Sequence, residues 1–417
     1  MGVGVLGSNA LPTNSQIKGF DKKLRMKSFL EDIYEDLKGT YVSKSKTIPN
    51  AIRMEVSEKE RAQSNNVTIT MILRLKGMGI YDPNPAIGQE ERPETRTFTI
   101  YRNIVRKVVT TPGYGPDDLD ARPYGLYENF VDQLAIWNKE HKGLSLRQAI
   151  LEQYGESLVH GRTLGASQRN WSPNMIVCGL DRTQMQVAYN TNRALYSTDI
   201  INRILLSGGG SLNQLVSQTL NMPNLSNAQN LALDNRITKL NIPGLPGGTG
   251  WVLTMSELQS VYLGDPAFST RNLGHFYVEK AALPETVQNW RGVLGFYKNF
   301  LLVEDVRQAT LKISGTSEPY GLTAGYVYPG DDNDDRDRNE VFTRDTANIL
   351  GKAAVVDWTA MPLRHIRQSD DYGMIQGHGT AVVEGCAMPI YDQQNPEAGT
   401  HEQYSSMIMV CGLPAYV

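Results

Sequence analysis

Two β-rich runs separated by a long polar connection constrain the fold of this chain most strongly. Residues Val67–Leu75 read VTITMILRL and place apolar side chains on one side of a strand, and Thr97–Thr110 is a second β-rich run. The 21 residues between them, Lys76–Arg96, include three glycines and three prolines. Loops longer than about 12–15 residues in compact proteins are usually functional or disordered. The pattern predicts an extended β-hairpin that reaches a partner.

Charged residues in two segments are candidates for contacts with a neighbouring subunit. Residues 20–38 read as an amphipathic helix that ends at Gly39, with basic residues first and acidic residues second, opposite to the order that the helix dipole favours. Such a charge run is usually a solvated face, and the alternative is an N-terminal arm that pairs with a neighbouring subunit. The candidate interface residues are Lys22, Lys23, Glu31 and Asp32 in this arm and Glu90, Glu91, Arg92 and Glu94 in the hairpin connection.

The size and charge of the chain limit the classes of protein to which it can belong. Its 417 residues exceed the roughly 250–300 at which a single core stops growing, so two or three lobes or one elaborated fold are expected. The 41 basic and 44 acidic residues leave a formal charge of −3, which disfavours a dedicated sequence-reading DNA protein. No apolar run approaches roughly 18 residues, so no membrane span is expected.

The cysteines indicate neither a disulfide framework nor a zinc site. Cys178, Cys386 and Cys411 are scattered singly, and no two of them form a CxxC pair. A reducing cytoplasm suits such a set.

Helical periodicity is clearest after the hairpin. An apolar stripe over 126–137 predicts a helix that ends near Gly143, and Ser145 with Gln148 forms a capping-box pattern that begins a second helix. The other segments predicted in this half are helices near 199–206 and 212–220 and a polar loop over 221–241.

The second half of the chain reads as mixed α/β and then returns to strands. A helix is expected to begin at Ser256, and residues 330–339 form an acidic loop. The predicted strands are Trp251–Thr254, Phe300–Val303, Ala353–Trp358, Gly373–Val383 and Ser406–Val410.

The acidic loop is the one segment that resembles a metal site. Asp331, Asp332 and Asp335 partly match a calcium loop, because hard cations require several carboxylate oxygens close together. However, Arg336 stands where the turn glycine is required, and Phe342 stands where the bidentate glutamate would be. A solvated loop is the favoured interpretation, and a weak cation site or interface is the alternative.

No motif indicates catalysis or a bound cofactor. The glycine-rich stretch Gly244–Gly250 precedes a strand and lacks a following Lys-Ser/Thr pair, which excludes the usual phosphate-binding loop. The six histidines show no metal-ligand spacing, and His378 lies in a β-rich run without a nucleophile motif. We therefore expect no catalytic residue, no cofactor and no metal.

An ordered set of motifs resembles a known family. The strand Trp251-Val252-Leu253, the helix start Ser256-Glu257-Leu258-Gln259 and the strands of 290–304, which read WRGVLGFYKNFLLVE, follow one another as in the N-four-type family of phage major capsid proteins. The segment 73–79 looks like the extended loop of that family, and 370–373 looks like its closing sheet. The similarity covers about residues 65–415.

The resemblance implies the Hong Kong 97-like capsid fold, an α+β architecture. It places an N-terminal arm at 1–66, an extended loop at 67–110 and an axial domain at 160–349. The peripheral domain would comprise 111–159 and 350–417, with Leu126–Lys142 as the spine helix.

The function implied is self-assembly into the icosahedral head shell of a tailed double-stranded DNA phage, without catalysis. The implied partners are further copies of the chain in pentamers and hexamers, together with scaffolding, portal and cement proteins and DNA contacted without sequence specificity. The protein would be assembled in the host cytoplasm and reside in the virion. The alternatives are an encapsulin-like nanocompartment shell and an enzyme with an unrecognised site, which could use the acidic loop.

Overall fold

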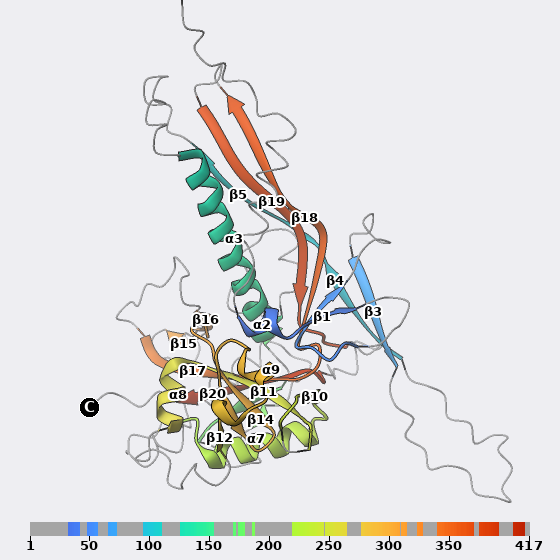
Figure 1. Cartoon of the computed structure of the whole chain (residues 1–417), viewed down its shortest axis with the longest axis vertical. Coiled ribbons are helices and arrows are strands. Elements are labelled where there is room, and N and C mark those ends of the chain that lie inside the picture. Colours follow the sequence, from blue (N-terminus) through green and yellow to red (C-terminus); the bar gives the residue numbers. More distant parts are fainter. Residues whose placement is uncertain are drawn as a thin grey trace, which may run out of the picture. The chain divides into compact units, whose positions relative to one another are not determined.

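The structure is a computed structural model, and its strands and helices fall into two compact units (Figure 1). Among the described residues, unit 1 comprises 102–110, 126–143, 359–370 and 375–385, and unit 2 comprises the others. The structure describes residues 32–41, 48–56, 66–72, 95–110, 126–153, 170–171, 174–179, 186–187, 219–245, 247–264, 277–308, 310–314, 323–327, 340–370, 375–391 and 403–412.

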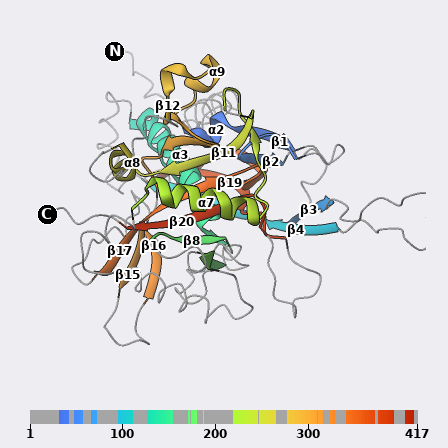
Figure 2. The same cartoon turned by 90° about the horizontal axis from the view of Figure 1, so that it is seen from below.

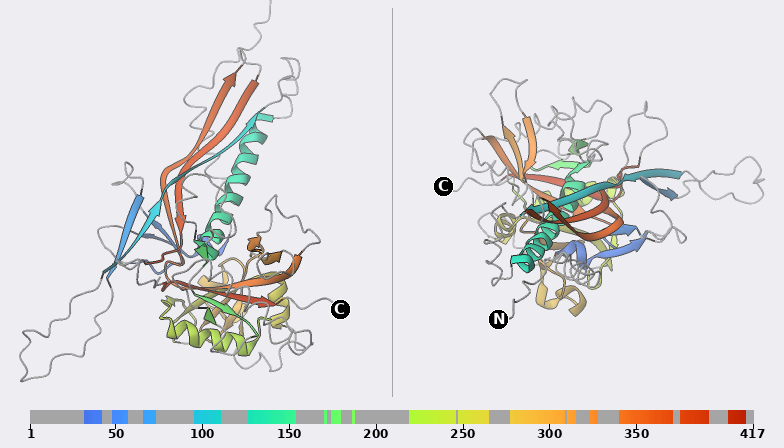
Figure 3. Two further views of the ribbon diagram at one scale, coloured as in Figure 1. Left: turned by 180° about the vertical axis from the view of Figure 1, so that it is seen from behind. Right: turned by 90° about the horizontal axis from the view of Figure 1, so that it is seen from above.

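Unit 1 is a helix packed on long strands. Helix α3 (Leu126–Leu151) contributes its residues up to Gly143, and it runs alongside β18 (Val355–Asp370) and β19 (Ile375–Ala387) in Figures 1 and 3. Strand β5 (Asn103–Thr110) pairs antiparallel with β19. The buried core consists of Val131, Leu134 and Ala135 of the helix with Leu363 and Val382 of the strands.

The helix of unit 1 corrects one prediction from the sequence. Gly143 and Ser145 lie inside the single helix α3, and no second helix begins at Ser145. Glycine in a helix interior costs only about 1 kcal/mol relative to alanine, and burial of Leu146 and Ile150 further along outweighs that cost. The expected strands near 353–358 and 373–383 are confirmed as β18 and β19, which are longer than predicted.

Unit 2 is built on an 11-stranded sheet. Its main strand order is β12-β13-β14-β11-β17-β20-β8-β9, with β10 paired to β11, β15 to β17 and β16 to β15. Strands β11 and β14 are parallel, whereas β17 is antiparallel to both β11 and β20. The bounds are β8 Met175–Val177, β9 Gln186–Val187, β10 Leu240–Asn241, β11 Thr249–Met255, β12 Tyr277–Glu279, β13 Val293–Tyr297, β14 Phe300–Glu304, β15 Thr310–Ser314, β16 Thr323–Val327, β17 Glu340–Leu350 and β20 Ser406–Gly412.

One face of this sheet is covered by helix α7 (Met222–Asp234), which is seen in Figure 2. The sequence prediction of a polar loop over 221–241 is wrong here. Asn221 caps the helix, because its side chain accepts a hydrogen bond from the N–H of Asn224 at 2.9 Å. Leu225, Ala228 and Leu231 then recur at helical spacing and are buried against the sheet.

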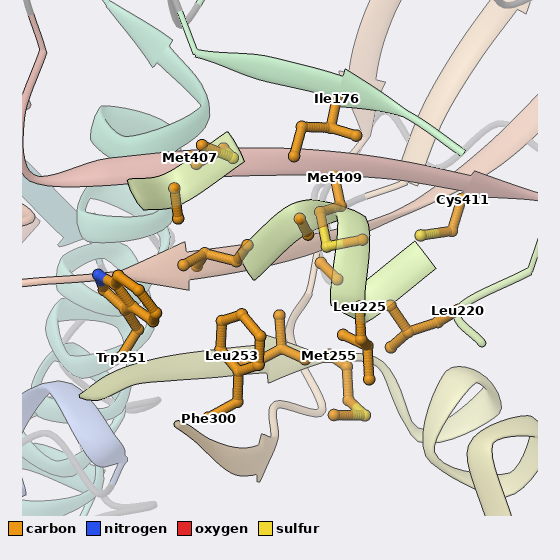
Figure 4. Packing of buried hydrophobic residues seen from close by; sticks show 14 of the residues in the cluster. Ile176, Leu220, Leu225, Trp251, Leu253, Met255, Phe300, Met407, Met409 and Cys411 are labelled. Carbon is orange, nitrogen blue, oxygen red and sulfur yellow. The ribbon is translucent and has the colours of Figure 1, made fainter. Parts of the chain in front are cut away.

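Figure 4 shows the packing between α7 and the sheet. Alternate residues of β11, among them Trp251 and Leu253, point toward the helix with Phe300 of β14 and Met407 and Met409 of β20. The predicted strands near 251–254, 300–303 and 406–410 are therefore confirmed. The other helical elements of unit 2 are α8 Glu257–Gly264, which follows Ser256 as expected, the 3₁₀ turn Lys280–Ala282 and α9 Glu285–Gln288.

The glycine-rich stretch before β11 is a turn. It joins β10 to the antiparallel β11, and Gly247 and Gly248 adopt positive φ angles of 80° and 68°. At Gly250, an added Cβ would lie 2.2 Å from the carbonyl oxygen of Asn299. The glycines are therefore explained by a tight turn and a close backbone approach.

The predicted hairpin is confirmed in its first part. Strand β3 (Asn66–Ile72) pairs antiparallel with β4 (Thr95–Tyr101), but the second run does not continue as one strand. It divides after Tyr101, and β5 pairs with β19 instead. The residues of the connection between β3 and β4 lie outside the described part of the chain.

A short parallel ladder completes unit 2. Strand β2 (Arg53–Val56) pairs in parallel with β1 (Lys38–Tyr41) and with the first four residues of β18. Strands β6 (Glu152–Gln153) and β7 (Asn170–Trp171) form a separate pair. None of the helices in the described ranges is long and apolar enough to cross a membrane.

Candidate functional site

The candidate site centres on α2 (Ile33–Asp36), which lies within the segment predicted to be an arm. The prediction of one helix over 20–38 is wrong at its end, because α2 stops at Asp36 and Gly39 lies within β1. Asp32 caps the short helix by accepting the N–H of Tyr34 at 3.1 Å. Ile33 and Tyr34 are fully buried, so the apolar side of α2 is fixed in unit 2.

The acidic side of α2 meets a buried arginine of α3. The Arg147 guanidinium donates two hydrogen bonds to Asp305, at 2.8 Å from Nε and 2.6 Å from Nη2, and a third to Asp32 at 3.2 Å. The guanidinium also lies over the ring of Tyr34, 5.3 Å from its centroid. Because the Arg147 side chain is only 3% exposed, these contacts form in a region with little solvent screening.

A second buried arginine contacts another acid of α2. Arg53 of β2 donates to Asp357 of β18 at 2.6 Å and 3.2 Å, and its Nη1 lies 2.5 Å from Glu35. Lys38 lies 3.5 Å from Glu35 and 2.8 Å from Glu55. Glu35 therefore joins α2 to two strands of the parallel ladder.

The third acid of α2 is also engaged. A carboxylate oxygen of Asp36 accepts the backbone N–H of Arg291 at 2.8 Å. The three acids Asp32, Glu35 and Asp36 thus contact three different parts of unit 2. The charge run of the predicted arm is, over these residues, an internal anchor.

The pKa shifts follow from burial and pairing. Burial alone would lower the pKa of Arg147, but the carboxylate of Asp305 raises it, so the net pKa lies above the ordinary value. The same balance, with Asp357 as partner, raises the pKa of Arg53. Burial raises the pKa of Asp32 although the Arg147 guanidinium opposes this effect. Both arginines therefore remain cations, and burial makes the charge of Asp32 costly to keep.

A separate buried carboxyl lies on the large sheet. Asp345 of β17 accepts a hydrogen bond from the Ser256 hydroxyl and another from the Thr346 N–H. Burial raises the pKa of Asp345 to about 6 despite both bonds. No cation is paired with this group in the described contacts, so its ionisation opposes folding near neutral pH.

The histidine prediction is confirmed in unit 1. His378 lies in β19, and its Nδ1 is 3.1 Å from Nε2 of His365 in β18. Both imidazoles are buried, and the Phe130 ring lies 6.0 Å from that of His378. Within the described residues, no group of three or more His, Cys, Asp or Glu side chains is placed to hold a metal ion.

Most of the candidate interface residues lie outside the part of the chain that the structure describes. These are Lys22, Lys23, Glu31, Glu90, Glu91, Arg92 and Glu94, together with the weak metal candidates Asp331, Asp332 and Asp335. Asp32 is described, and its carboxylate is engaged with Arg147 inside unit 2. Its role at a subunit interface stays a prediction, as do the roles of the others.

Sequence reasoning missed the two arginines. Arg53 and Asp357 are 304 residues apart, and Arg147 and Asp305 are 158 apart, so no local motif links either pair. One signal was present at Arg53, which interrupts the otherwise apolar stretch AIRM. A charged residue inside a buried strand requires a partner, and this requirement identifies the position but not the acid.

A long helix on long strands, a paired hairpin and a large mixed sheet make this chain an α+β protein. No family model matches the sequence, and no curated protein matches it. Solved structures do share its fold. The capsid of Ralstonia phage GP4 matches with a TM-score of 0.52 and 15% identity, covering 100% of both chains.

Two further solved structures agree. The head structure of Helicobacter pylori bacteriophage KHP40 has a TM-score of 0.54 and 11% identity over 92% of this chain and 90% of the other. The capsid asymmetric unit of cyanophage Pam1 has a TM-score of 0.54 and 12% identity over 93% of each chain. The expected Hong Kong 97-like capsid fold is thereby confirmed for this chain.

Proposed function

We propose that this chain is the major capsid protein of a tailed double-stranded DNA phage and that it belongs to the N-four-type family. The observation that carries the proposal is the extent of the shared fold, because the match to the Ralstonia phage capsid covers all of both chains. A match restricted to one lobe would support only a shared domain. The N-four-type assignment rests on the ordered motifs of 251–304.

The proposed mechanism is assembly of many copies through repeated contacts. Closed shells require each subunit to present matching surfaces whose symmetry closes the assembly. The proposed divisions are an arm at 1–66, an extended loop at 67–110, a peripheral domain at 111–159 and 350–417, and an axial domain at 160–349. Pentamers and hexamers would form the shell, with scaffolding, portal and cement proteins as further partners.

The base of the hairpin supports a role in contact with a neighbour. Val67 and Ile69 face their cross-strand partners Ile100 and Phe98, and all four are buried. The opposite face carries threonines, two of which, Thr68 and Thr99, lie 3.2 Å apart in an exposed position. An anchored base with a long connection that carries Glu90, Glu91 and Glu94 suits a segment that reaches across to another copy.

The charge balance suits a container for DNA. A formal charge of −3 avoids a strongly basic lining, which would bind the packaged polymer tightly through its phosphates. DNA would be contacted without sequence specificity. The protein would assemble in the host cytoplasm and remain in the virion.

Negative-stain electron microscopy of the purified full chain, with its hydrodynamic mass, tests this proposal. Closed shells or rings of five and six subunits are expected. A monodisperse monomer or dimer that stays so when scaffolding protein is co-expressed would refute it. Shells that enclose enzyme cargo in place of DNA would favour the nanocompartment alternative.

A charge reversal tests the extended loop. The double variant Glu90→Lys/Glu91→Lys should fold but assemble poorly, because acidic residues that face a neighbour become basic. The matched control is Glu257→Lys/Glu285→Lys, which makes the same charge change at two exposed positions of α8 and α9. Normal shells from the Glu90/Glu91 variant would exclude this part of the loop from the interface.

A further inference from the structure

Two of the three cysteines meet in the core of unit 2. The Sγ atoms of Cys178 and Cys411 lie 3.3 Å apart, and neither side chain is exposed to solvent. Cys386 is half-buried, and all three are thiols in this structure. The sequence places Cys178 and Cys411 233 positions apart, so nothing in their spacing indicated a pair.

The sheet brings them together by register. Strands β8 and β20 are parallel, with Val177 opposite Val410, so Cys178 and Cys411 are the next residues along. The ladder continues to this point, because the Cys178 N–H donates to the Val410 carbonyl at 2.9 Å. Both side chains point to the face covered by α7, where Figure 4 shows Cys411 near Met409 and Leu220.

The geometry suits a covalent bond between these strands. Neighbouring strands lie about 4.7–4.9 Å apart, which is within the Cα separation of about 4.4–6.8 Å that disulfides span. The Sγ atoms already face each other, so closing the bond requires small rotations of the two side chains. Strand β8 is three residues long and is followed in the sheet by the two-residue β9, so local opening of this end would admit a small oxidant.

We propose that Cys178 and Cys411 form an oxidisable dithiol, which closes to an intrachain disulfide when the protein meets a disulfide oxidant such as oxidised glutathione. One thiol, as thiolate, attacks the glutathione disulfide and releases one glutathione thiolate. The second protein thiolate then attacks the mixed disulfide and releases the other. One protein S–S bond forms, one glutathione S–S bond breaks, and the two protons pass to the two glutathiones.

Only the expected timing of this oxidation rests on the proposed function. A shell protein folds in a reducing cytoplasm and, after release of the particle, remains in an oxidising medium. Closure after assembly would covalently join β8 to β20 and thereby resist unfolding of the large sheet. The dithiol chemistry itself depends only on the subunit fold.

Refolding in a glutathione redox buffer tests the inference. The full chain is unfolded in urea with reductant and diluted into oxidised and reduced glutathione, and free thiols are blocked before non-reducing peptide mapping by mass spectrometry. In an unfolded chain, loop-closure entropy favours the 386–411 link over the 178–411 link about thirtyfold, because the first loop is 25 residues and the second is 233. Native pairing should reverse this preference and make 178–411 the dominant link.

The controls separate the possible outcomes. The Cys386→Ser variant should give the same 178–411 link, whereas Cys178→Ala and Cys411→Ala should abolish it. Oxidised wild-type protein should melt about 5 °C or more above the reduced protein, and Cys178→Ala should show no such difference. A dominant 386–411 link, or full recovery of free thiols at Cys178 and Cys411 in the oxidising buffer, overturns the inference.

Electron microscopy of the same samples keeps the two proposals apart. Shells that form normally but never contain the 178–411 link would refute the dithiol alone. A subunit that forms the link but never assembles would refute the capsid function alone.

Discussion

The contact of Arg147 with Asp305 and Asp32 offers a direct test of how α2 is held. Replacing Arg147 by methionine keeps a long side chain with high helix propensity and removes the guanidinium. The variant leaves the carboxylates of Asp305 and Asp32 without the guanidinium of Arg147, whose side chain is only 3% exposed. Removing one partner of a buried ion pair costs about 3–5 kcal/mol, so a loss of unfolding free energy in that range is expected at pH 7.

Protonation limits the cost and makes it depend on pH. A carboxyl with an ordinary pKa of 3.8 can be neutralised at pH 7 for about 4.4 kcal/mol, and at pH 5 for about 1.6 kcal/mol. Without Arg147, the folded-state pKa of Asp32, already raised by burial, rises further. Stability that depends on the protonated acid is fully present below pH 3.8 and is lost as the pH rises through the folded pKa. The penalty of Arg147→Met should therefore fall to roughly 2 kcal/mol or less at pH 5.

Urea unfolding followed by tryptophan fluorescence measures this penalty. Trp251 and Trp358 are both fully buried in unit 2 and report on its unfolding. The control is Arg364→Met, which removes an exposed guanidinium from β18 and should change stability by no more than about 0.5 kcal/mol. A penalty below 1 kcal/mol at pH 7, or one that is equal at pH 5 and pH 7, would refute the reasoning.

Three further predictions concern other polar groups. Asp345→Asn should stabilise the protein at pH 7 and remove a pH dependence of stability between about pH 4 and 6. The reason is that the raised pKa of Asp345 makes wild-type stability fall as the pH rises through 6, and urea titrations at pH 5 and pH 7 measure this. Asn221→Ala should lower the unfolding free energy by about 1 kcal/mol, because it removes the cap of α7, whereas Ser226→Ala in the same helix should lower it less. Equal losses in urea unfolding would count against the role of the cap. Arg53→Met alone should lower the unfolding free energy by about 3–5 kcal/mol, and adding Asp357→Leu should recover most of that loss. A double-mutant cycle without this recovery would show that the cost is not simply that of an unpaired buried carboxylate.

The sequence predicted several elements correctly where local pattern and burial agree. Strand β11 and the start of α8 at Ser256 follow from an apolar run and a capping residue, and both lie where expected. Helix α7 was missed because its asparagines were interpreted as loop residues. The decisive signal was the pair Asn221 and Pro223, a cap followed by a proline in the first turn.

The errors at α3 and β5 have a different cause. A glycine and a capping-box pattern suggested a break at 143–145, but tertiary packing of Leu146 and Ile150 keeps the helix continuous. The division between β4 and β5 depends on β19, which lies more than 260 residues further along the chain. Local sequence does not encode which distant strand a run will pair with, and the arginine contacts were not predictable for the same reason.

The two arginine networks contribute more to the placement of α2 than to overall stability. A buried ion pair gains little net free energy over a well-packed apolar contact, because desolvation offsets the attraction. An apolar contact can slide, however, whereas a guanidinium with two bonds to Asp305 has one favourable orientation. Arg147 engages Asp32, the N-cap of the short helix, and Arg53 engages Glu35 in its last turn, so α2 is held at both points. The position of Asp32 and of α2 within unit 2 is therefore defined by charge pairing.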